Sequence, residues 1–191
     1  MRDHKDFIVD RLLKSNMTIS FAESVTGGMV SATLVAVPHV SQVFKGSIVA
    51  YNPEAKMNLL NVKKETIQKC GTISAEIARE MAIGAIKKFN SNVSVGITGL
   101  AGPDGVENKP VGLYYFCIII QDHAYEYEGR INKEEVVKMI RDINGEDNEH
   151  EQVILSRDEA LTRTCYRRIM TMRIIEELSK LVIKQTTQPR I

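Results

Sequence analysis

Short runs rich in β-branched and aromatic residues alternate with longer stretches of helical periodicity along this chain. This alternation is typical of a sheet whose strands are connected by helices that pack back on it. The strands are predicted over residues 17–22, 43–51, 93–98, 111–121 and 124–130. The helices are predicted over residues 3–15, 25–36, 54–60, 66–70, 74–89 and 158–184. We therefore expect an α/β protein, a three-layer α/β/α sandwich with a mixed, mostly parallel sheet of about five strands.

The length fits a single domain spanning residues 1–191, since a chain of 191 residues buries a substantial core without disulfides. A formal net charge of +1 disfavours binding to nucleic acid or to an anionic membrane, and neither is an expected partner. The charged N-terminus lacks an apolar signal core, so we expect a cytoplasmic protein. The three cysteines lie far apart and are expected to be buried, reduced thiols. The four histidines lack metal-ligand spacing, and we expect no metal site.

Residues 131–152 differ from the rest of the chain, because they contain a short amphipathic piece, 136–143, followed by the acidic run 145–151. We interpret them as a charged surface insertion, in which a solvated loop is favoured over a partner-binding segment or a lid. The C-terminal helix after this segment has an apolar stripe that should dock on the sheet. Its members are Leu161, Cys165, Ile169, Met172, Ile175, Leu178 and Val182.

The segment 22–28 places the hydroxyl of Ser24 at a turn between a predicted strand and a predicted helix. The first N–H groups of a helix have no intrahelical partner and lie at the positive end of the helix dipole, where an anion or an oxyanion is stabilised. Gly27 and Gly28 would let a ligand approach the backbone. The alternative is that Ser24 or Thr26 only caps the following helix.

Four stretches, in order, resemble the CinA C-terminal domain family, whose characterised members are nicotinamide mononucleotide (NMN) deamidases. They are Ala22-Glu23-Ser24-Val25-Thr26-Gly27-Gly28, Gly46-Ser47-Ile48-Val49-Ala50-Tyr51-Asn52-Pro53-Glu54-Ala55-Lys56, Ile97-Thr98-Gly99-Leu100-Ala101-Gly102-Pro103 and Lys109-Pro110-Val111-Gly112. The resemblance implies hydrolysis of NMN to nicotinate mononucleotide and ammonia, a reaction of pyridine nucleotide salvage, without metal or other cofactor. It also implies a homo-oligomer, which we expect to be a dimer.

The resemblance implies that Ser24 is the nucleophile and that Tyr51 and Lys56 assist it. A serine hydroxyl needs a base, and a lysine serves if burial lowers its pKa from about 10.4 toward 7 or 8. Tyr51 would relay or orient the proton, whereas Glu23, if it lay beside the lysine, would raise the lysine pKa. Taken alone, Lys56 is typical of an exposed helix lysine and Tyr51 of a strand end. The catalytic interpretation predicts that Ser24 Oγ and Lys56 Nζ lie within hydrogen-bond reach in a cleft.

The substrate-binding candidates fall in three segments. N–H groups of Thr26, Gly27 or Gly28 are predicted to hold the oxyanion. The stretch Thr98, Gly99, Ala101 and Gly102 is predicted to meet the ribose phosphate through its backbone, although such a loop is often only a turn. Arg163 and Arg167 are predicted as charged partners of the phosphate, with surface pairs to acids such as Glu159 as the alternative.

The likeness to the family weakens after about residue 120, where Thr162 precedes Arg163 in place of the family's acidic residue. These departures leave open an alternative from another class. The chain would then be a catalytically inactive nucleotide-binding or protein-interaction module related to competence or DNA-damage functions. A third possibility is hydrolysis of another small amide.

Overall fold

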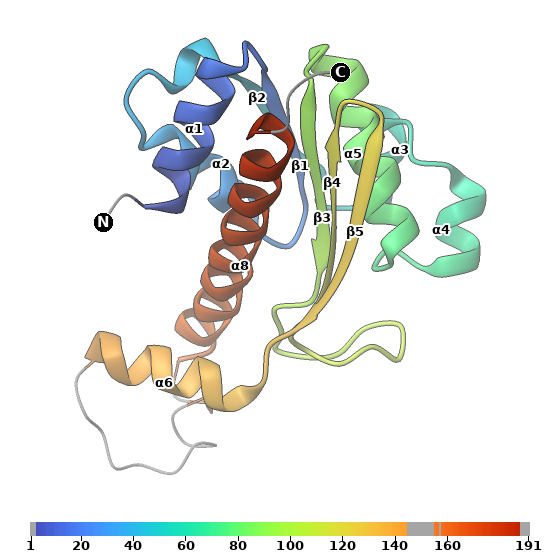
Figure 1. Ribbon diagram of the computed structural model, residues 1–191. Coiled ribbons are helices and arrows are strands. Elements are labelled where there is room, and N and C mark those ends of the chain that lie inside the picture. The colour runs from blue at the N-terminus through green and yellow to red at the C-terminus, as the bar shows by residue number, and fades with distance from the viewer. Residues whose placement is uncertain (1–2, 145–154, 157, 188–191) are drawn as a thin grey trace.

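The computed structural model describes residues 3–144, 155–156 and 158–187, and its described part has a sheet of five strands. In space the strands follow the order β2-β1-β3-β4-β5. Their bounds are β1 Ile19–Glu23, β2 Phe44–Val49, β3 Val93–Gly99, β4 Leu113–Ile120 and β5 His123–Arg130. β1 pairs in parallel with β2 and β3, whereas β4 is antiparallel to β3 and β5 (Figure 1). The predicted α/β class with a mixed sheet is confirmed.

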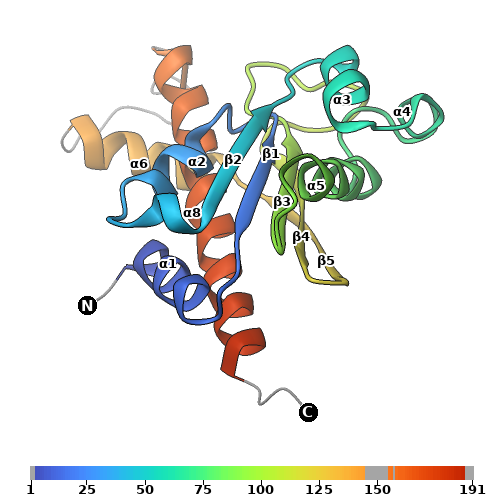
Figure 2. The ribbon, with the colours of Figure 1, turned by 90° about the horizontal axis from the view of Figure 1, so that it is seen from above.

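Helices cover both faces of the sheet, as Figures 1 and 2 show from two directions. On one face lie α1 His4–Lys14, α2 Met29–Val35, α6 Lys133–Asn144 and the long α8 Glu159–Thr187. The other face carries α3 Pro53–Leu60, α4 Lys64–Cys70 and α5 Ala75–Phe89. A short 3₁₀ helix, η1 Val40–Gln42, precedes β2. The result is the expected three-layer α/β/α sandwich.

Local chemistry explains where the site-bearing helices begin. Asn52 caps α3, because its Oδ1 accepts a hydrogen bond from the N–H of Ala55, and Pro53 supplies the first residue without an N–H to satisfy. Helix α2 begins at Met29, later than the predicted start at residue 25. The reason is the turn before it, in which Gly27 and Gly28 have φ of 59° and 92°, in the left-handed region.

Helix α8 docks on the sheet through most of the predicted apolar stripe, in which Cys165, Ile175, Leu178 and Val182 are buried. Met172 is an exception, since it is 63% exposed and faces away from the core. Its place in the stripe was wrong because Met170 and Ile174, both 0% exposed, occupy the buried face at this level of the helix.

Residues 131–144 are part of the packed fold and not a surface loop. Ile131 precedes α6, and Val136, Val137 and Ile140 of that helix are buried in the same core as α8. The prediction of a solvated insertion is therefore wrong for this part, because its apolar residues recur at helical spacing and cover the end of α8. The acidic run 145–151 lies outside the described residues.

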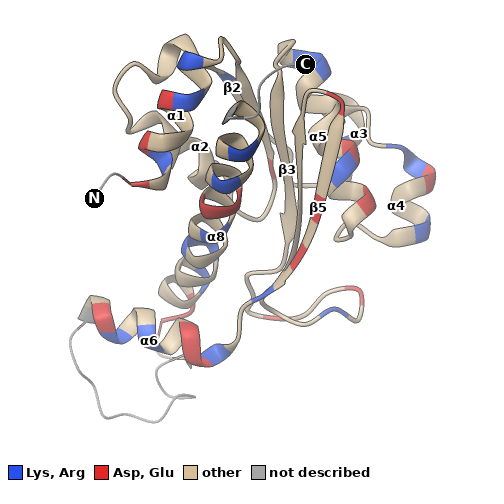
Figure 3. Ribbon diagram, in the orientation of Figure 1, with Lys and Arg blue, Asp and Glu red and all other residues tan. Residues whose placement is uncertain are grey.

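Charges of both signs are interspersed over α1, α6 and α8 (Figure 3). Cys117 and Cys165 are buried free thiols, and Cys70 is half-buried. Burial raises the pKa of Cys117 to about 12, so this thiol stays protonated. Within the described ranges, no helix is long and apolar enough to cross a membrane, and no group of three or more His, Cys, Asp or Glu side chains is placed to hold a metal ion.

Candidate active site

Ser24 and Lys56 form a buried pair between the turn after β1 and the first turns of α3. Lys56 Nζ lies 2.9 Å from Ser24 Oγ and also donates a hydrogen bond of 2.9 Å to the carbonyl of Ala50. Lys56 is 2% exposed and Ser24 is 7% exposed. The predicted hydrogen-bond contact of these two side chains is confirmed, and the alternative of an exposed helix lysine is wrong.

Burial also changes the titration of the lysine. Removal from water lowers the pKa of Lys56 from 10.5 to about 8, and the negative charge of Glu107 partly opposes this effect. At pH 7 about one Lys56 in ten is then neutral, and a neutral amine can accept the proton of a neighbouring hydroxyl. The short contact and the lowered pKa of Lys56 are the two properties that a lysine base beside a serine nucleophile needs.

Tyr51 lies just beyond β2 and is 58% exposed. Its hydroxyl accepts a hydrogen bond from Nη2 of Arg163. In the part of the chain that the structure describes, no hydrogen bond joins Tyr51 to Ser24 or Lys56. The expected direct relay between Tyr51 and Lys56 is therefore not present, because the tyrosine side chain turns outward to α8.

The carboxylate of Glu23 occupies the N-terminus of α2. It is fully buried and accepts hydrogen bonds from the N–H groups of Gly28, Val30 and Ser31 and from the Ser31 hydroxyl. Its charge is stabilised there by the positive end of the helix dipole. Glu23 therefore does not orient Lys56.

This arrangement corrects the predicted oxyanion donors. The N–H of Gly28 donates to Glu23 and the N–H of Gly27 donates to the carbonyl of Ser24, so the expectation that Gly27 or Gly28 is available to hold the oxyanion is wrong. The N–H of Thr26 has no hydrogen-bond partner among the described residues, and its buried Oγ1 also lacks one there. Because the N-cap of α2 is Gly28, the alternative that Ser24 or Thr26 caps the helix is wrong too.

Arg163 and Arg167, one turn apart on α8, hold the site segments together. Nη2 of Arg167 donates a hydrogen bond of 2.8 Å to the carbonyl of Thr26, and a Cβ at Gly27 would lie 2.9 Å from this nitrogen. Arg163 donates to the carbonyl of Gly102 and to the hydroxyl of Tyr51. Both arginines thus contact segments of the predicted site, and their role as partners of a phosphate stays a prediction.

A pocket of about 270 Å³ lies beside the loop after β3, and Arg163 is one of its walls. Ala101 and Gly102 line it, as their predicted binding role requires, whereas Thr98 and Gly99 do not. The Thr98 hydroxyl instead donates to the carbonyl of Thr72. The pocket lining does not include Ser24 or Lys56. It is formed by Ala101, Gly102, Pro103, Val111, Lys133, Leu155, Ser156, Glu159, Thr162, Arg163 and Tyr166.

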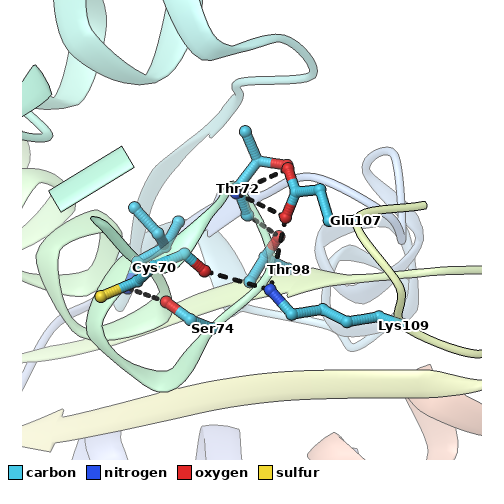
Figure 4. A network of polar contacts seen from close by, with 7 residues as sticks. Cys70, Thr72, Ser74, Thr98, Glu107 and Lys109 are labelled. Atoms are coloured by element: carbon cyan, nitrogen blue, oxygen red, sulfur yellow. Dashed lines mark hydrogen bonds and ion pairs between the residues drawn. The ribbon is translucent and has the colours of Figure 1, made fainter. Parts of the chain in front are cut away.

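One polar network near the site was missed in the sequence (Figure 4). Glu107 and Lys109 lie in the loop between β3 and β4. Glu107 contacts Thr72 in the connection between α4 and α5, and Lys109 contacts the carbonyl of Cys70, the last residue of α4. The network involves side-chain contacts to backbone atoms 35 and 39 residues away. Such contacts follow no periodic pattern, so only the stretch Lys109-Pro110-Val111-Gly112 pointed to this part of the chain.

Comparison with known proteins gives a match between residues 1–142 and the model of the CinA C-terminal domain. The chain belongs to the CinA C-terminal domain family. A CinA-like protein of Fervidobacterium nodosum is 55% identical over 120 residues, which are 62% of this chain and 29% of that protein. The Protein MG115 homolog of Mycoplasma pneumoniae is 44% identical over 124 residues, which are 65% of this chain and 79% of that protein.

Solved structures of CinA superfamily proteins share the fold of this CinA domain. A competence-damaged protein (CinA) superfamily protein from Klebsiella pneumoniae has a TM-score of 0.70 at 22% identity, over 93% of this chain and 96% of that one. The competence damage-inducible protein A from the same species has a TM-score of 0.71 at 18% identity, over 97% and 99%. At these identities the likeness concerns the fold alone.

The family match covers most of the site but not all of it. It includes Ser24, Tyr51, Lys56 and the loop after β3, whereas Arg163 and Arg167 lie beyond residue 142. The chain spans less than a third of the Fervidobacterium protein.

Proposed function

We propose that this CinA domain is an amidohydrolase that converts NMN to nicotinate mononucleotide and ammonia. The observation that carries the proposal is the buried contact of 2.9 Å between Ser24 Oγ and Lys56 Nζ. The pKa of about 8 for Lys56 supports it, because a lysine that releases its proton near neutral pH can serve as a base. Family membership is compatible with this activity.

The reaction proceeds in two stages. Neutral Lys56 takes the proton of Ser24 as Oγ attacks the carboxamide carbon, and the protonated lysine then gives this proton to the leaving nitrogen, which departs as ammonia. Water next attacks the Ser24 ester while Lys56 accepts its proton. As the bond from the acyl carbon to Oγ breaks, protonated Lys56 returns this proton to Ser24 Oγ, which restores the hydroxyl. The acid product releases its own proton to water and leaves as the carboxylate.

The surrounding groups have roles in this scheme. The N–H of Thr26, unpartnered within the described residues, is the remaining candidate donor to the oxyanion. Arg163 and Arg167 are the candidate partners of the substrate phosphate, which would compete for their hydrogen bonds to Gly102, Tyr51 and Thr26. Tyr51 keeps Arg163 in place and so acts on substrate orientation.

The test is release of ammonia from NMN by the purified chain, with the product identified by its mass. Ser24→Ala and Lys56→Met should each reduce turnover by 10³-fold or more, on the order seen when a nucleophile or its base is removed. Lys45→Met, which removes an exposed lysine of β2, is the matched control and should retain activity. Activity of Ser24→Ala close to wild type would refute the assignment.

A second candidate function is a nucleotide-binding module that binds NMN but does not convert it. It is favoured by one observation, the absence of Ser24 and Lys56 from the lining of the pocket beside Arg163. Calorimetry separates the two functions. Binding of NMN without any ammonia release by the wild-type protein supports the module, whereas turnover excludes it.

A further inference from the structure

The tip of the loop between β3 and β4 is a tight turn with an unusual residue. Val106 and Lys109 form an antiparallel bridge, and the N–H of Lys109 donates to the carbonyl of Val106 at 3.0 Å. Glu107 and Asn108 between them have φ of 57° and 58°. Two consecutive left-handed residues define a type I′ turn, for which Asn and Gly are preferred. A glutamate is strained in this conformation, so contacts of its side chain must hold it there.

Those contacts are present and dock the turn on the connection between α4 and α5 (Figure 4). The Glu107 carboxylate accepts hydrogen bonds from the N–H of Thr72, at 3.0 and 3.1 Å, and from the Thr72 hydroxyl at 2.9 Å. Lys109 Nζ donates to the carbonyl of Cys70 at 3.0 Å and to Glu107 at 3.3 Å. A Cβ at Gly71 would lie 2.0 Å from Glu107 Oε2, so this approach requires glycine.

The same loop forms a wall of the candidate site. Ala101, Gly102 and Val111, on either side of the turn, line the pocket, and the Gly102 carbonyl accepts from Arg163. Thr72, which binds Glu107, also accepts a hydrogen bond at its carbonyl from the hydroxyl of Thr98, near the end of β3. The turn is thus tethered at its tip, while its two arms form part of the site.

Glu107 also acts on Lys56 through its charge. Lys56 Nζ contacts the Ser24 hydroxyl and the Ala50 carbonyl, and the charge of the Glu107 carboxylate acts on it from farther away. Lys109 Nζ lies 3.3 Å from that carboxylate. Glu23 adjoins Ser24 in the chain, but its carboxylate is bound at the N-terminus of α2. Burial alone would raise the pKa of Glu107, yet hydrogen bonds from Thr72 and Lys109 keep it below its ordinary value, so the negative charge persists.

We propose that Glu107 is a positioning residue of the Ser24–Lys56 site, which docks the loop wall on Thr72 and presents a charge to the lysine, with Lys109 moderating that charge. The inference rests on the proposed amidohydrolase function. It adds two residues, from a segment with no direct contact to Ser24, to the groups that set the chemistry of the site.

Two substitutions of nearly constant shape test the electrostatic part. In Glu107→Gln the attraction for the Lys56 ammonium is lost, so the pKa of Lys56 should fall, and screening of the carboxylate by water keeps this fall small. In Lys109→Met a repelling charge is lost, so this pKa should rise. The acid limb of the pH profile of kcat/KM should move in the same two opposite directions. If Glu107 and Lys109 had only a structural role, both substitutions would shift the pKa of Lys56 in the same direction.

The Lys56 titration is followed by NMR of ¹³Cε-labelled lysine in the full chain, with Lys56→Met to assign the signal. This measurement needs no turnover, so the effect of Glu107 and Lys109 on Lys56 can be tested even if NMN is not a substrate. Unchanged or parallel shifts in Glu107→Gln and Lys109→Met would overturn the proposal.

Hydrogen exchange tests the docking part. Glu107→Ala removes the contacts to Thr72 and should increase exchange of amides 99–112, with a fall in kcat/KM of about ten- to a hundred-fold from loss of positioning. Asn108→Gly keeps the turn and removes a side chain that has no hydrogen bond among the described residues, so its exchange should match the wild type. Unaltered exchange in Glu107→Ala would contradict the docking role.

Discussion

Lys56 is a buried lysine whose hydrogen-bond partners, the Ser24 hydroxyl and the Ala50 carbonyl, are both uncharged. Neither partner compensates the loss of hydration with an opposite charge, and Glu107 acts only from farther away. The protonated form is therefore destabilised in the folded protein. The base role proposed for Lys56 near neutral pH depends on this cost to stability.

The same cost makes stability depend on pH in a predictable direction. The pKa of Lys56 is about 8 in the folded protein and 10.5 in the unfolded chain, so between these values the unfolded chain binds more protons. Raising the pH through this window should increase the free energy of unfolding by about 3 kcal/mol through this residue. In Lys56→Met that contribution is absent. The free energy of unfolding of Lys56→Met minus that of wild type should therefore fall by about the same amount from pH 8 to 10.5.

Urea denaturation at a series of pH values measures this difference, because other titrating groups cancel between the two proteins. Lys45→Met controls for loss of one positive charge at the surface. A constant difference between Lys56→Met and wild type across the window would mean that Lys56 stays protonated when folded, and a base role at neutral pH would be untenable.

Helix α8 connects the core to the site, because its buried face packs with α1, α2 and the sheet while its first turns carry Arg163 and Arg167. Periodicity predicted the helix and most of its buried face. It did not resolve which methionine points inward, since Met170 and Met172 both adjoin the stripe and only packing against α1 and the sheet decides.

These two methionines form a matched pair for a stability test. Met170→Ala removes a fully buried side chain and should lower the free energy of unfolding by about 2–5 kcal/mol. Met172→Ala truncates a side chain that is 63% exposed and should change it by less than about 0.5 kcal/mol. Chemical denaturation of both variants measures these changes in the free energy of unfolding. An equal loss in Met172→Ala would show that this face is covered in solution, as in the expected homo-oligomer.

The whole molecule joins segments that are distant in sequence, and this limits what could be predicted. The α/β class follows from alternating periodicity, and the contact of Ser24 with Lys56 followed from the family resemblance. The sequence could not predict that the N–H groups of Gly27 and Gly28 bind acceptors within the protein, because this depends on the conformation of the turn and on where the Glu23 side chain lies. The docking of Glu107 on Thr72 likewise depends on a loop conformation that leaves no sequence pattern.

Because the candidate site is assembled from the turn after β1, the start of α3, the loop after β3 and α8, it exists only in the folded chain. A ligand that binds there stabilises the folded state against global unfolding. For Ser24→Ala, which should bind NMN without consuming it, a concentration a hundred times Kd adds about 2.7 kcal/mol. In a chain of this size that corresponds to a rise in Tm of about 5–10 °C. Differential scanning calorimetry with NMN, and with nicotinamide as a control lacking ribose and phosphate, measures it. If NMN and nicotinamide leave Tm equally unchanged while the variant is folded, the site does not recognise this nucleotide, and both the deamidase and the nucleotide-binding module would be ruled out for NMN.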